Sequence, residues 1–310
     1  MSRSGVNILI YHRVLDGPDP MRPGEVDVQQ FNKQMRWIKR FYNVLDLSEA
    51  LDRQKNNTLP PRALSITFDD GYRDNFTNAL PILQSHQLKA TFFIATGFLN
   101  GGIMWNDVII ESIRRTKANI FDLTNYGLEK YDISEKDIKV LHKILADIKY
   151  LSIEVRTQLI RNVPELLNVN LPTDLMMSSG EVNSMFNQGM AIGGHTVNHP
   201  ILSTLKASDA KSEITAGKVF LEELIGAPVD LFAYPNGGPD QDYTQEHINI
   251  VDGLGFKAAV STAWGVATSE SDSFQLPRFT PWDQNIYRFL LRLWMMQFSE
   301  KEKVVTFNSL

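Results

Sequence analysis

Short apolar runs alternate with segments of helical periodicity along most of the chain. In the helical segments apolar residues recur every three or four positions, as Phe31, Met35 and Ile38 do. This alternation is typical of a mainly parallel sheet with helices outside it, and we predict an α/β fold, a distorted (β/α)7-type barrel. The expected strands are Asn7–Tyr11, Asn43–Leu47, Leu64–Phe68, Ala90–Ala95, Met190–Gly194, Leu231–Tyr234 and Ala258–Thr262.

The alternation is interrupted between residues 101 and 179. Helical periodicity dominates there, as in DISEKDIKVLHKILADIKYL. We expect a helical insertion after the fourth strand, sitting as a cap on a single barrel domain that spans residues 1–310. Because loops at the carboxyl ends of barrel strands build active sites, such an insertion would shape substrate access.

Composition narrows the class of protein. The formal net charge of -5 argues against a nucleic-acid binder, whose phosphate contacts need a basic face. The absence of cysteine excludes disulfides and thiolate ligands, so a metal site must use His, Asp, Glu or water. We see no apolar stretch long enough to cross a membrane and no signal-peptide run, so the expected location is cytoplasmic.

Two adjacent acids end the third expected strand. The segment LSITFDDGYRDN stops at Asp69 and Asp70, which Gly71 follows at once. A turn is one interpretation, because Asp-Gly is a common turn and Asp caps helices well. The alternative is a pair of functional carboxylates at the rim of the barrel.

Two histidines follow another expected strand. AIGGHTVNHPILSTL sets His195 and His199 four residues apart, a spacing that can place both imidazoles on one side of a helical turn. Strand ends of one polarity meet at one face of a parallel barrel, so we expect them near Asp69 and Asp70. Two imidazoles and one carboxylate would hold a divalent metal ion and leave a position for water. The other carboxylate is then free for acid–base work on water activated by the metal.

A third strand end carries a Pro-Asn-Gly-Gly turn. LFAYPNGGPD places Tyr234 and Asn236 there. The segment is either a turn alone or a device that aims a backbone N–H at an oxyanion.

These motifs together resemble the polysaccharide deacetylases, also called carbohydrate esterase family 4 or the NodB-homology group. TFDDG at 67–71 matches the family's first motif, HTVNHP at 195–200 matches its H-[ST]-x-x-H-P motif, and FAYPNG at 232–237 lies where the third motif belongs. The resemblance covers nearly the whole chain apart from the insertion. It implies a distorted barrel and metal-dependent hydrolysis of N-acetyl or O-acetyl groups on sugars.

The resemblance also implies roles for individual residues. Asp69 matches the catalytic base, and Asp70, His195 and His199 match the ligands of one divalent metal ion, usually zinc. The family's third motif normally has an Arg that orients the catalytic Asp and a Tyr whose backbone N–H faces the oxyanion. Those positions are Ala233 and Asn236 here, so the chain departs from the pattern. Arg278, in LPRFTPW, is the candidate replacement for the Arg, with a surface charge as the alternative.

The general acid is the second departure. The family motif that supplies it ends a late strand in Leu-x-His, but no histidine follows His247 in this chain. NILIYHRV ends in His12 at the start of the chain, and the first and last strands of a closed barrel are neighbours. We therefore predict a circularly permuted motif order with His12 as the general acid. A histidine that only ends the first strand is the alternative.

Two tryptophans are candidates for contact with a sugar. Trp105 could line the cleft from the insertion and Trp282 could stack on a sugar face, with core packing as the alternative for both.

The predicted function is zinc-dependent removal of an N-acetyl group from an amino sugar in a cell-surface or extracellular polysaccharide or its precursor. The partner is thus a carbohydrate. Removal of another acyl group, such as formyl, from a lipid- or nucleotide-linked sugar is an alternative, and an inactive carbohydrate-binding descendant is another. A metal phosphoesterase would need more carboxylate ligands or a second metal, and a more basic pocket.

Overall fold

The computed structural model describes residues 5–281, 283, 285–296 and 304–305, which divide into two compact units. Unit 1 comprises the described residues of 1–17, 24–100 and 176–310, and unit 2 comprises 18–23 and 101–175. The strands are β1 (Gly5–Tyr11), β2 (Val14–Leu15), β3 (Val26–Asp27), β4 (Asn43–Val44), β5 (Ala63–Phe68), β6 (Thr91–Ile94), β7 (Ile120–Asp122), β8 (Lys130–Asp132), β9 (Ala191–Gly194), β10 (Leu231–Ala233), β11 (Ala258–Trp264), β12 (Ala267–Thr268) and β13 (Leu276–Arg278). The α-helices are α1 (Val28–Phe41), α2 (Leu47–Lys55), α3 (Leu80–Ser85), α4 (Trp105–Arg115), α5 (Ile138–Lys149), α6 (Ile153–Leu166), α7 (Ser179–Asn187), α8 (Ala207–Ile225), α9 (Gln245–Gly253) and α10 (Ile286–Met295). The short helices are η1 (Asn75–Ala79), η2 (Thr96–Phe98), η3 (Thr124–Tyr126) and η4 (Leu202–Thr204).

The main sheet of unit 1 is a nearly closed barrel. Its strands follow the order β12-β1-β5-β6-β9-β10-β11-β13, with β4 beside β5, and every neighbouring pair from β1 to β13 is parallel. β1 also meets the segment after β13, because the Ile10 N–H donates to Phe279 O at 3.0 Å and the Phe279 N–H donates to Ile8 O at 2.8 Å. The predicted distorted barrel is therefore confirmed, with eight strands along its path instead of seven.

The two faces of this sheet bury different residues, because side chains alternate along a strand. One set of side chains packs inside the barrel. Among the described helices, only α2 contributes residues to this set. We call these positions inward; they include Val6, Ile8, Ala63, Phe93, Leu231, Ala233, Ala258, Val260 and Leu276. The other set packs against the surrounding helices. We call these positions outward; they include Leu9, Tyr11, Ile66, Phe68, Phe92, Phe232, Tyr234 and Phe279.

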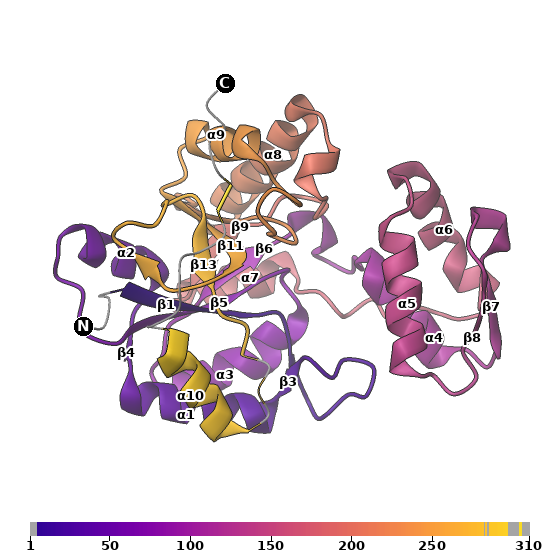
Figure 1. Cartoon of the computed structure of the whole chain (residues 1–310), viewed down its shortest axis with the longest axis horizontal. Helices are drawn as coiled ribbons and strands as arrows, with labels where there is room; N and C mark the ends of the chain where they lie inside the picture. The colour runs from indigo at the N-terminus through magenta and orange to yellow at the C-terminus, as the bar shows by residue number, and fades with distance from the viewer. Residues whose placement is uncertain (1–4, 282, 284, 297–303, 306–310) are drawn as a thin grey trace. The chain divides into compact units, whose positions relative to one another are not determined.

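The surrounding helices are amphipathic and cover the outward positions. Phe31, Met35 and Ile38 of α1 are fully buried, as their helical spacing predicts. α8 ends at Gly226, whose φ of +66° is the left-handed conformation that favours glycine at a helix end. Figure 1 shows α8 and α9 on one side of the sheet and α1, α3 and α10 on the other.

One strand prediction was too long, and several short strands were missed. The strand expected at Asn43–Leu47 covers only Asn43–Val44, because Asp46 accepts hydrogen bonds from the N–H groups of Ser48 and Glu49 and so starts α2 at Leu47. β13 was not predicted. It has three residues with Pro277 in the middle, a composition that normally argues against a strand.

Unit 2 has a hydrophobic core of its own, which includes Ile109, Ile144 and Leu159. Its helices α4, α5 and α6 agree with the helical pattern, but the sequence did not predict the antiparallel ribbon β7–β8. Residues 18–23 belong to this unit because Arg22 pairs with Asp107 at 2.6 Å, an ion pair that is almost fully buried. α7 lies in unit 1, and the role of the insertion as a cap stays a prediction.

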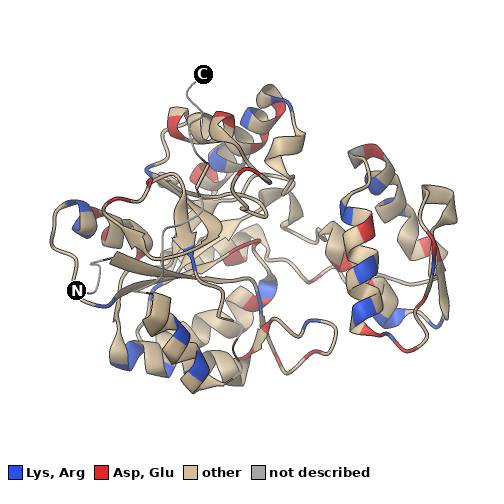
Figure 2. Cartoon of the chain, viewed as in Figure 1, with Lys and Arg blue, Asp and Glu red and all other residues tan. Residues whose placement is uncertain are grey.

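Charged residues of both signs are interspersed on the helices of each unit, as Figure 2 shows. Among the helices in the described parts of the chain, none is both long and apolar enough to cross a membrane.

Candidate active site and metal centre

A buried ion pair stands at the carboxyl end of β5. Asp69 is the first residue after β5 and follows the alternation of its inward positions. Arg278 is the last residue of β13 and is likewise inward. The Arg278 Nη1 and Nη2 atoms each donate to one Asp69 carboxylate oxygen at 2.7 Å, and its Nε donates to Ser261 O at 2.8 Å. Arg278 is 1% exposed, so it is not a surface charge. The structure brings the two residues together across the barrel, and their catalytic role stays a prediction.

The pair fixes the charge of Asp69. Burial acts to raise the pKa of the Asp69 carboxyl, but the Arg278 guanidinium, with smaller contributions from His195 and His12, lowers it below its ordinary value. Asp69 is therefore held ionised and in one orientation by a planar, bidentate partner.

Asp70 follows Asp69 just after the end of β5. As the next residue along the strand it would point outward, but its φ of +79° is left-handed and turns the chain. Its Oδ1 lies 3.3 Å from His195 Nε2 and 3.4 Å from His199 Nε2. The three ligand atoms that these residues offer all lie within 4.8 Å of one another, so the predicted ligand set is brought together.

The three residues fit a small divalent cation. The His195 Nδ1–H donates to Ala233 O at 2.7 Å, since a carbonyl can only accept, so Nε2 is the ring nitrogen left to bind a cation. Asp70 Oδ1 is buried and has no hydrogen-bond partner within the described part of the chain. Tetrahedral bonds of about 2.0–2.1 Å would set ligand atoms about 3.3–3.4 Å apart. The two measured Nε2–Oδ1 distances agree with that separation.

The electrostatics also suit a cation. Burial lowers the pKa of His199 to about 4, so its ring is neutral at pH 7, which is the form that binds metal. For Asp70 burial acts to raise the pKa, but the adjacent imidazoles lower it well below its usual value. Burial opposes protonation of His195, whereas the Asp70 carboxylate favours it, with a raised pKa as the result.

The histidine pair lies on a loop and not on a helical turn. The segment between His195 and Pro200 has no helix, and both Thr196 (φ +65°) and His199 (φ +52°) are left-handed. The Thr196 hydroxyl donates to His195 O and accepts the His199 N–H at 3.0 Å. The four-residue spacing, which a helical turn could also have served, is closed here by a hydroxyl-bridged turn.

His12 lies across from Asp69 on the neighbouring strand. The register pairs Tyr11 with Phe68 at the ends of β1 and β5, and the Asp69 N–H donates to Tyr11 O at 2.9 Å, so His12 and Asp69 follow neighbouring strand ends. The Asn75 side chain donates to His12 O at 2.8 Å and holds its backbone. Burial is the largest influence on the pKa of Asp69 and of Asp70 and acts to raise it. The charge of His12 is one of several that lower it.

The sequence comparison decides the family. The model of the polysaccharide deacetylase family matches residues 56–150 and 154–259, about two thirds of the chain. The chain belongs to the polysaccharide deacetylase family. The matched residues include Asp69, Asp70 and the histidine pair, whereas His12 and Arg278 lie outside them. The match therefore leaves the permuted motif order untested.

Relatives and solved structures agree with this family and fold. YxkH of Bacillus subtilis, named for the same family, is 22% identical over 273 residues, which are 87% of this chain and 69% of YxkH. The poly-beta-1,6-N-acetyl-D-glucosamine N-deacetylase of Staphylococcus aureus is 30% identical over 119 residues, 38% of this chain and 39% of that protein. The deacetylase PplD of Streptococcus pyogenes, solved with acetate, has a TM-score of 0.64 at 21% identity and covers 94% of this chain and 98% of PplD. IcaB of Ammonifex degensii has a TM-score of 0.60 at 17% identity, covering 95% and 97%.

The end of β10, where the family's third motif belongs, corrects one prediction. Tyr234 is an outward residue, 1% exposed, and its ring stacks on Tyr243 with the centroids 3.9 Å apart. Its side chain belongs to the core between sheet and helices, so it is not a substrate-contacting group. Asn236 has an exposed side chain and a left-handed backbone (φ +58°), and its carbonyl accepts from the Thr262 hydroxyl at 3.0 Å. Its backbone N–H stays a prediction as an oxyanion donor.

The two tryptophans are placed differently. Trp105 begins α4 in unit 2 and packs against that unit's core. The Arg156 Cζ atom lies over its ring, 5.5 Å from the ring centroid. Its contact with a sugar stays a prediction. Trp282 lies outside the described residues.

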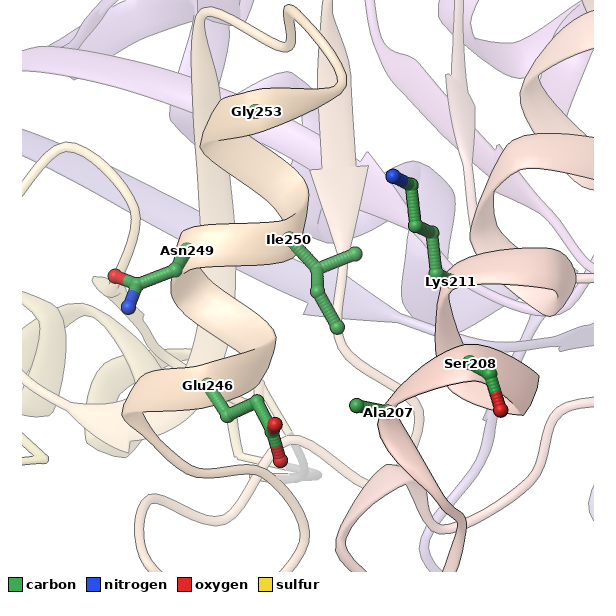
Figure 3. Close-up of a pocket in the computed structure, with 7 residues that line it drawn as sticks. All are labelled: Ala207, Ser208, Lys211, Glu246, Asn249, Ile250 and Gly253. Carbon is green, nitrogen blue, oxygen red and sulfur yellow. The ribbon is translucent and has the colours of Figure 1, made fainter.

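A groove of about 610 Å³ lies between α8 and α9, and Figure 3 shows residues of both helices facing it. Its lining residues are Ala207, Ser208, Lys211, Glu246, Asn249, Ile250 and Gly253. None of them is a candidate catalytic or metal-binding residue. We therefore place the chemistry at the strand ends and not in this groove.

Sequence reasoning missed Glu213 of α8, which accepts hydrogen bonds from the loop that carries the histidines. A single acid within an amphipathic helix resembles any solvated charge, so its sequence context held no signal for this contact.

Proposed function

We propose that this chain is a divalent-metal-dependent hydrolase that removes the N-acetyl group from an amino sugar of a polysaccharide or its precursor, with zinc as the metal. One observation carries the proposal. A buried, ionised Asp69 on Arg278 stands directly beside an Asp70–His195–His199 set whose spacing fits a small cation. This is one base next to one metal site, the minimum that hydrolysis of an amide requires.

The division of labour follows from the contacts. A divalent ion held by Asp70, His195 and His199 would polarise the acyl carbonyl and favour ionisation of water near neutral pH. Asp69 has both oxygens on Arg278 and is not part of the ligand set, so it is free to accept the proton of the attacking water. The backbone N–H of Asn236 is the proposed donor to the oxyanion.

His12 is the proposed general acid. As the carbon–nitrogen bond breaks, the sugar nitrogen must gain a proton, because an amine leaves poorly as an anion. His12 stands next to Asp69 in register, at the end of β1, and β1 adjoins the segment after β13. A strand moved from the end of the chain to its start would keep this position in a closed barrel, which supports the permuted order.

The substrate class rests on the family and on one group of relatives. The Staphylococcus aureus relatives are named for an N-deacetylase of poly-beta-1,6-N-acetyl-D-glucosamine, and their match covers little more than a third of this chain. An N-acetylated glucosamine polymer is therefore the first substrate to test.

The test is acetate release from a panel of N-acetylated glucosamine oligomers, O-acetylated glycans and sugar nucleotides. We expect release from N-acetylated oligomers, loss of activity with a chelator, and its return with Zn²⁺. Formate from N-formylated sugars without acetate would favour the other acyl group. No hydrolysis of any compound by metal-loaded protein, together with glycan binding, would favour an inactive carbohydrate-binding descendant and overturn the proposal.

A further inference from the structure

The loop that carries both histidines adopts a conformation that its sequence does not favour. Thr196 and His199 are left-handed, and Thr196 is β-branched, so this backbone is strained and needs support from its surroundings. The loop is also responsible for the position of two of the three proposed ligands. What holds it therefore sets the geometry of the site.

One side chain holds the peptide groups between the two histidines. Glu213 Oε2 accepts the Val197 N–H at 3.1 Å and the Asn198 N–H at 2.8 Å, and Glu213 Oε1 accepts the Asn198 side-chain amide at 2.7 Å. A charged acceptor makes hydrogen bonds roughly twice as strong as those of a neutral one. A single carboxylate thus fixes three donors on two successive residues.

The same helix meets the loop backbone one turn later. A Cβ on Gly217 would lie 3.0 Å from both the carbonyl carbon and oxygen of Thr196, a tighter contact than most Cβ atoms make, so glycine lets α8 lie close against the loop there. Glu213 and Gly217 are four residues apart and share one helix face. α8 therefore supports the loop by direct backbone contact as well as by the carboxylate.

The carbonyl groups of the loop are tied to the backbone of Asp70, the proposed metal-binding acid. The Thr96 and Gly97 N–H groups donate to Thr196 O at 3.2 Å and to Val197 O at 2.8 Å. One residue earlier, the Ala95 N–H donates to Asp70 O at 3.3 Å. The turn after β6 thus links the backbone of Asp70 to the carbonyl groups of the histidine loop, whose N–H groups Glu213 accepts.

We propose that Glu213 is a positioning residue for the metal centre: it holds the His195–His199 loop so that both Nε2 atoms face Asp70. The inference rests on the proposed metal dependence. A metal site tolerates ligand displacements of only about 0.2 Å, so release of two peptide groups between the ligands weakens the site without removing a ligand.

The experiment compares Glu213→Ala with Glu222→Ala in the full chain. Glu222 lies on the same helix and likewise accepts a backbone N–H, that of Val229 at 3.0 Å, so the variants remove the same group from the same helix. The metal-free proteins are titrated with Co²⁺, followed by the visible absorption of the bound ion. We expect Glu213→Ala to weaken Co²⁺ binding by about 10- to 100-fold and to change the absorption spectrum. Glu222→Ala leaves both unchanged.

A third variant separates positioning from folding. Glu213→Gln keeps an acceptor for the two peptide N–H groups, so it should recover most of the affinity and the wild-type spectrum. Thermal melting of the metal-free variants should show similar losses for Glu213→Ala and Glu222→Ala. Wild-type affinity and spectrum in Glu213→Ala, or an equal loss of affinity in Glu222→Ala, would overturn the inference. Failure of the wild-type protein itself to bind Co²⁺ or Zn²⁺ would instead overturn the proposed function.

Discussion

Inward and outward positions at the same strand ends carry opposite kinds of residue. At the inward positions stand Asp69, His195 and Arg278, all polar: Asp69 and Arg278 form an ion pair, and His195 donates to Ala233 O. One residue earlier, the outward positions hold Tyr11 and Phe68, whose rings stack on each other in the core against α1. Whether a residue takes an inward or an outward position along the strand, more than its nearness in sequence to a motif, therefore decides whether it serves chemistry or packing.

Asp70 is the exception that the backbone explains. It follows Asp69 directly and would face the helices if the strand continued. Its left-handed φ of +79° turns the chain out of the strand direction, and the carboxylate lies within 3.4 Å of both imidazoles. Two adjacent acids can therefore serve the same site because the chain leaves the strand direction at Asp70.

The largest expected effects separate these two acids. Asp69→Asn should lower acetate release by about 10⁴-fold, near the upper end for loss of a base, while Zn²⁺ content stays at one per chain. Asp70→Asn should instead lose most of the bound metal, because it removes a ligand. Metal content by elemental analysis and acetate release are measured on the same samples. Equal metal loss in both variants would contradict the division of labour.

His12→Ala should lower turnover by about 10²–10⁴-fold, the usual contribution of a general acid, with metal content unchanged. The loss should be smaller for substrates whose leaving amine is less basic, since such an amine needs less help from a proton. His86→Ala is the control, because His86 lies on the outer surface after α3 and pairs with Asn32 there. Near-normal turnover of His12→Ala would refute the role of His12 and, with it, the permuted order.

Removal of the Arg278 guanidinium should lower the free energy of unfolding. Arg278 and Asp69 are 0% and 3% exposed as side chains, so Arg278→Gln leaves a buried carboxylate without its partner, at a cost of about 3–5 kcal/mol in the free energy of unfolding. Arg53→Gln is the matched control. It breaks the Arg53–Glu49 pair, whose side chains are 45% and 44% exposed, and should cost below about 1 kcal/mol.

Urea unfolding of the metal-free proteins measures both variants. The double variant Asp69→Asn, Arg278→Gln should be more stable than Arg278→Gln alone, because it removes the unpaired charge. A double variant that loses the sum of both single losses would show that the two residues do not interact as an ion pair in solution.

The sequence predicted the parts of the site that lie in contiguous motifs. Asp69, Asp70, His195 and His199 stand at strand ends, and a parallel barrel brings strand ends together whatever the lengths of chain between them. Glu213 and the left-handed turn at Thr196 could not be predicted, because they depend on how one helix packs on one loop. The ribbon β7–β8 was missed for a different reason: three-residue strands are too short for periodicity to detect.

The smallest expected effect tests the outward position that was first assigned to chemistry. Tyr234 followed the third motif in sequence, but the strand register could have excluded it, since Leu231 and Ala233 are inward and Tyr234 is therefore outward. Among the described residues its hydroxyl has no hydrogen-bond partner, although it is buried. Tyr234→Phe removes only that unpaired oxygen.

We therefore expect Tyr234→Phe to leave acetate release unchanged and the free energy of unfolding equal or higher by up to about 1 kcal/mol. Tyr243→Phe is the control within the same ring stack. The Tyr243 hydroxyl donates to Gln275 Oε1 at 3.3 Å, so its removal should destabilise the protein by about 0.5–1.5 kcal/mol. Urea unfolding and acetate release of the two variants, side by side, measure the difference. A large loss of turnover in Tyr234→Phe with normal stability would return Tyr234 to the chemistry and break the distinction between inward and outward positions.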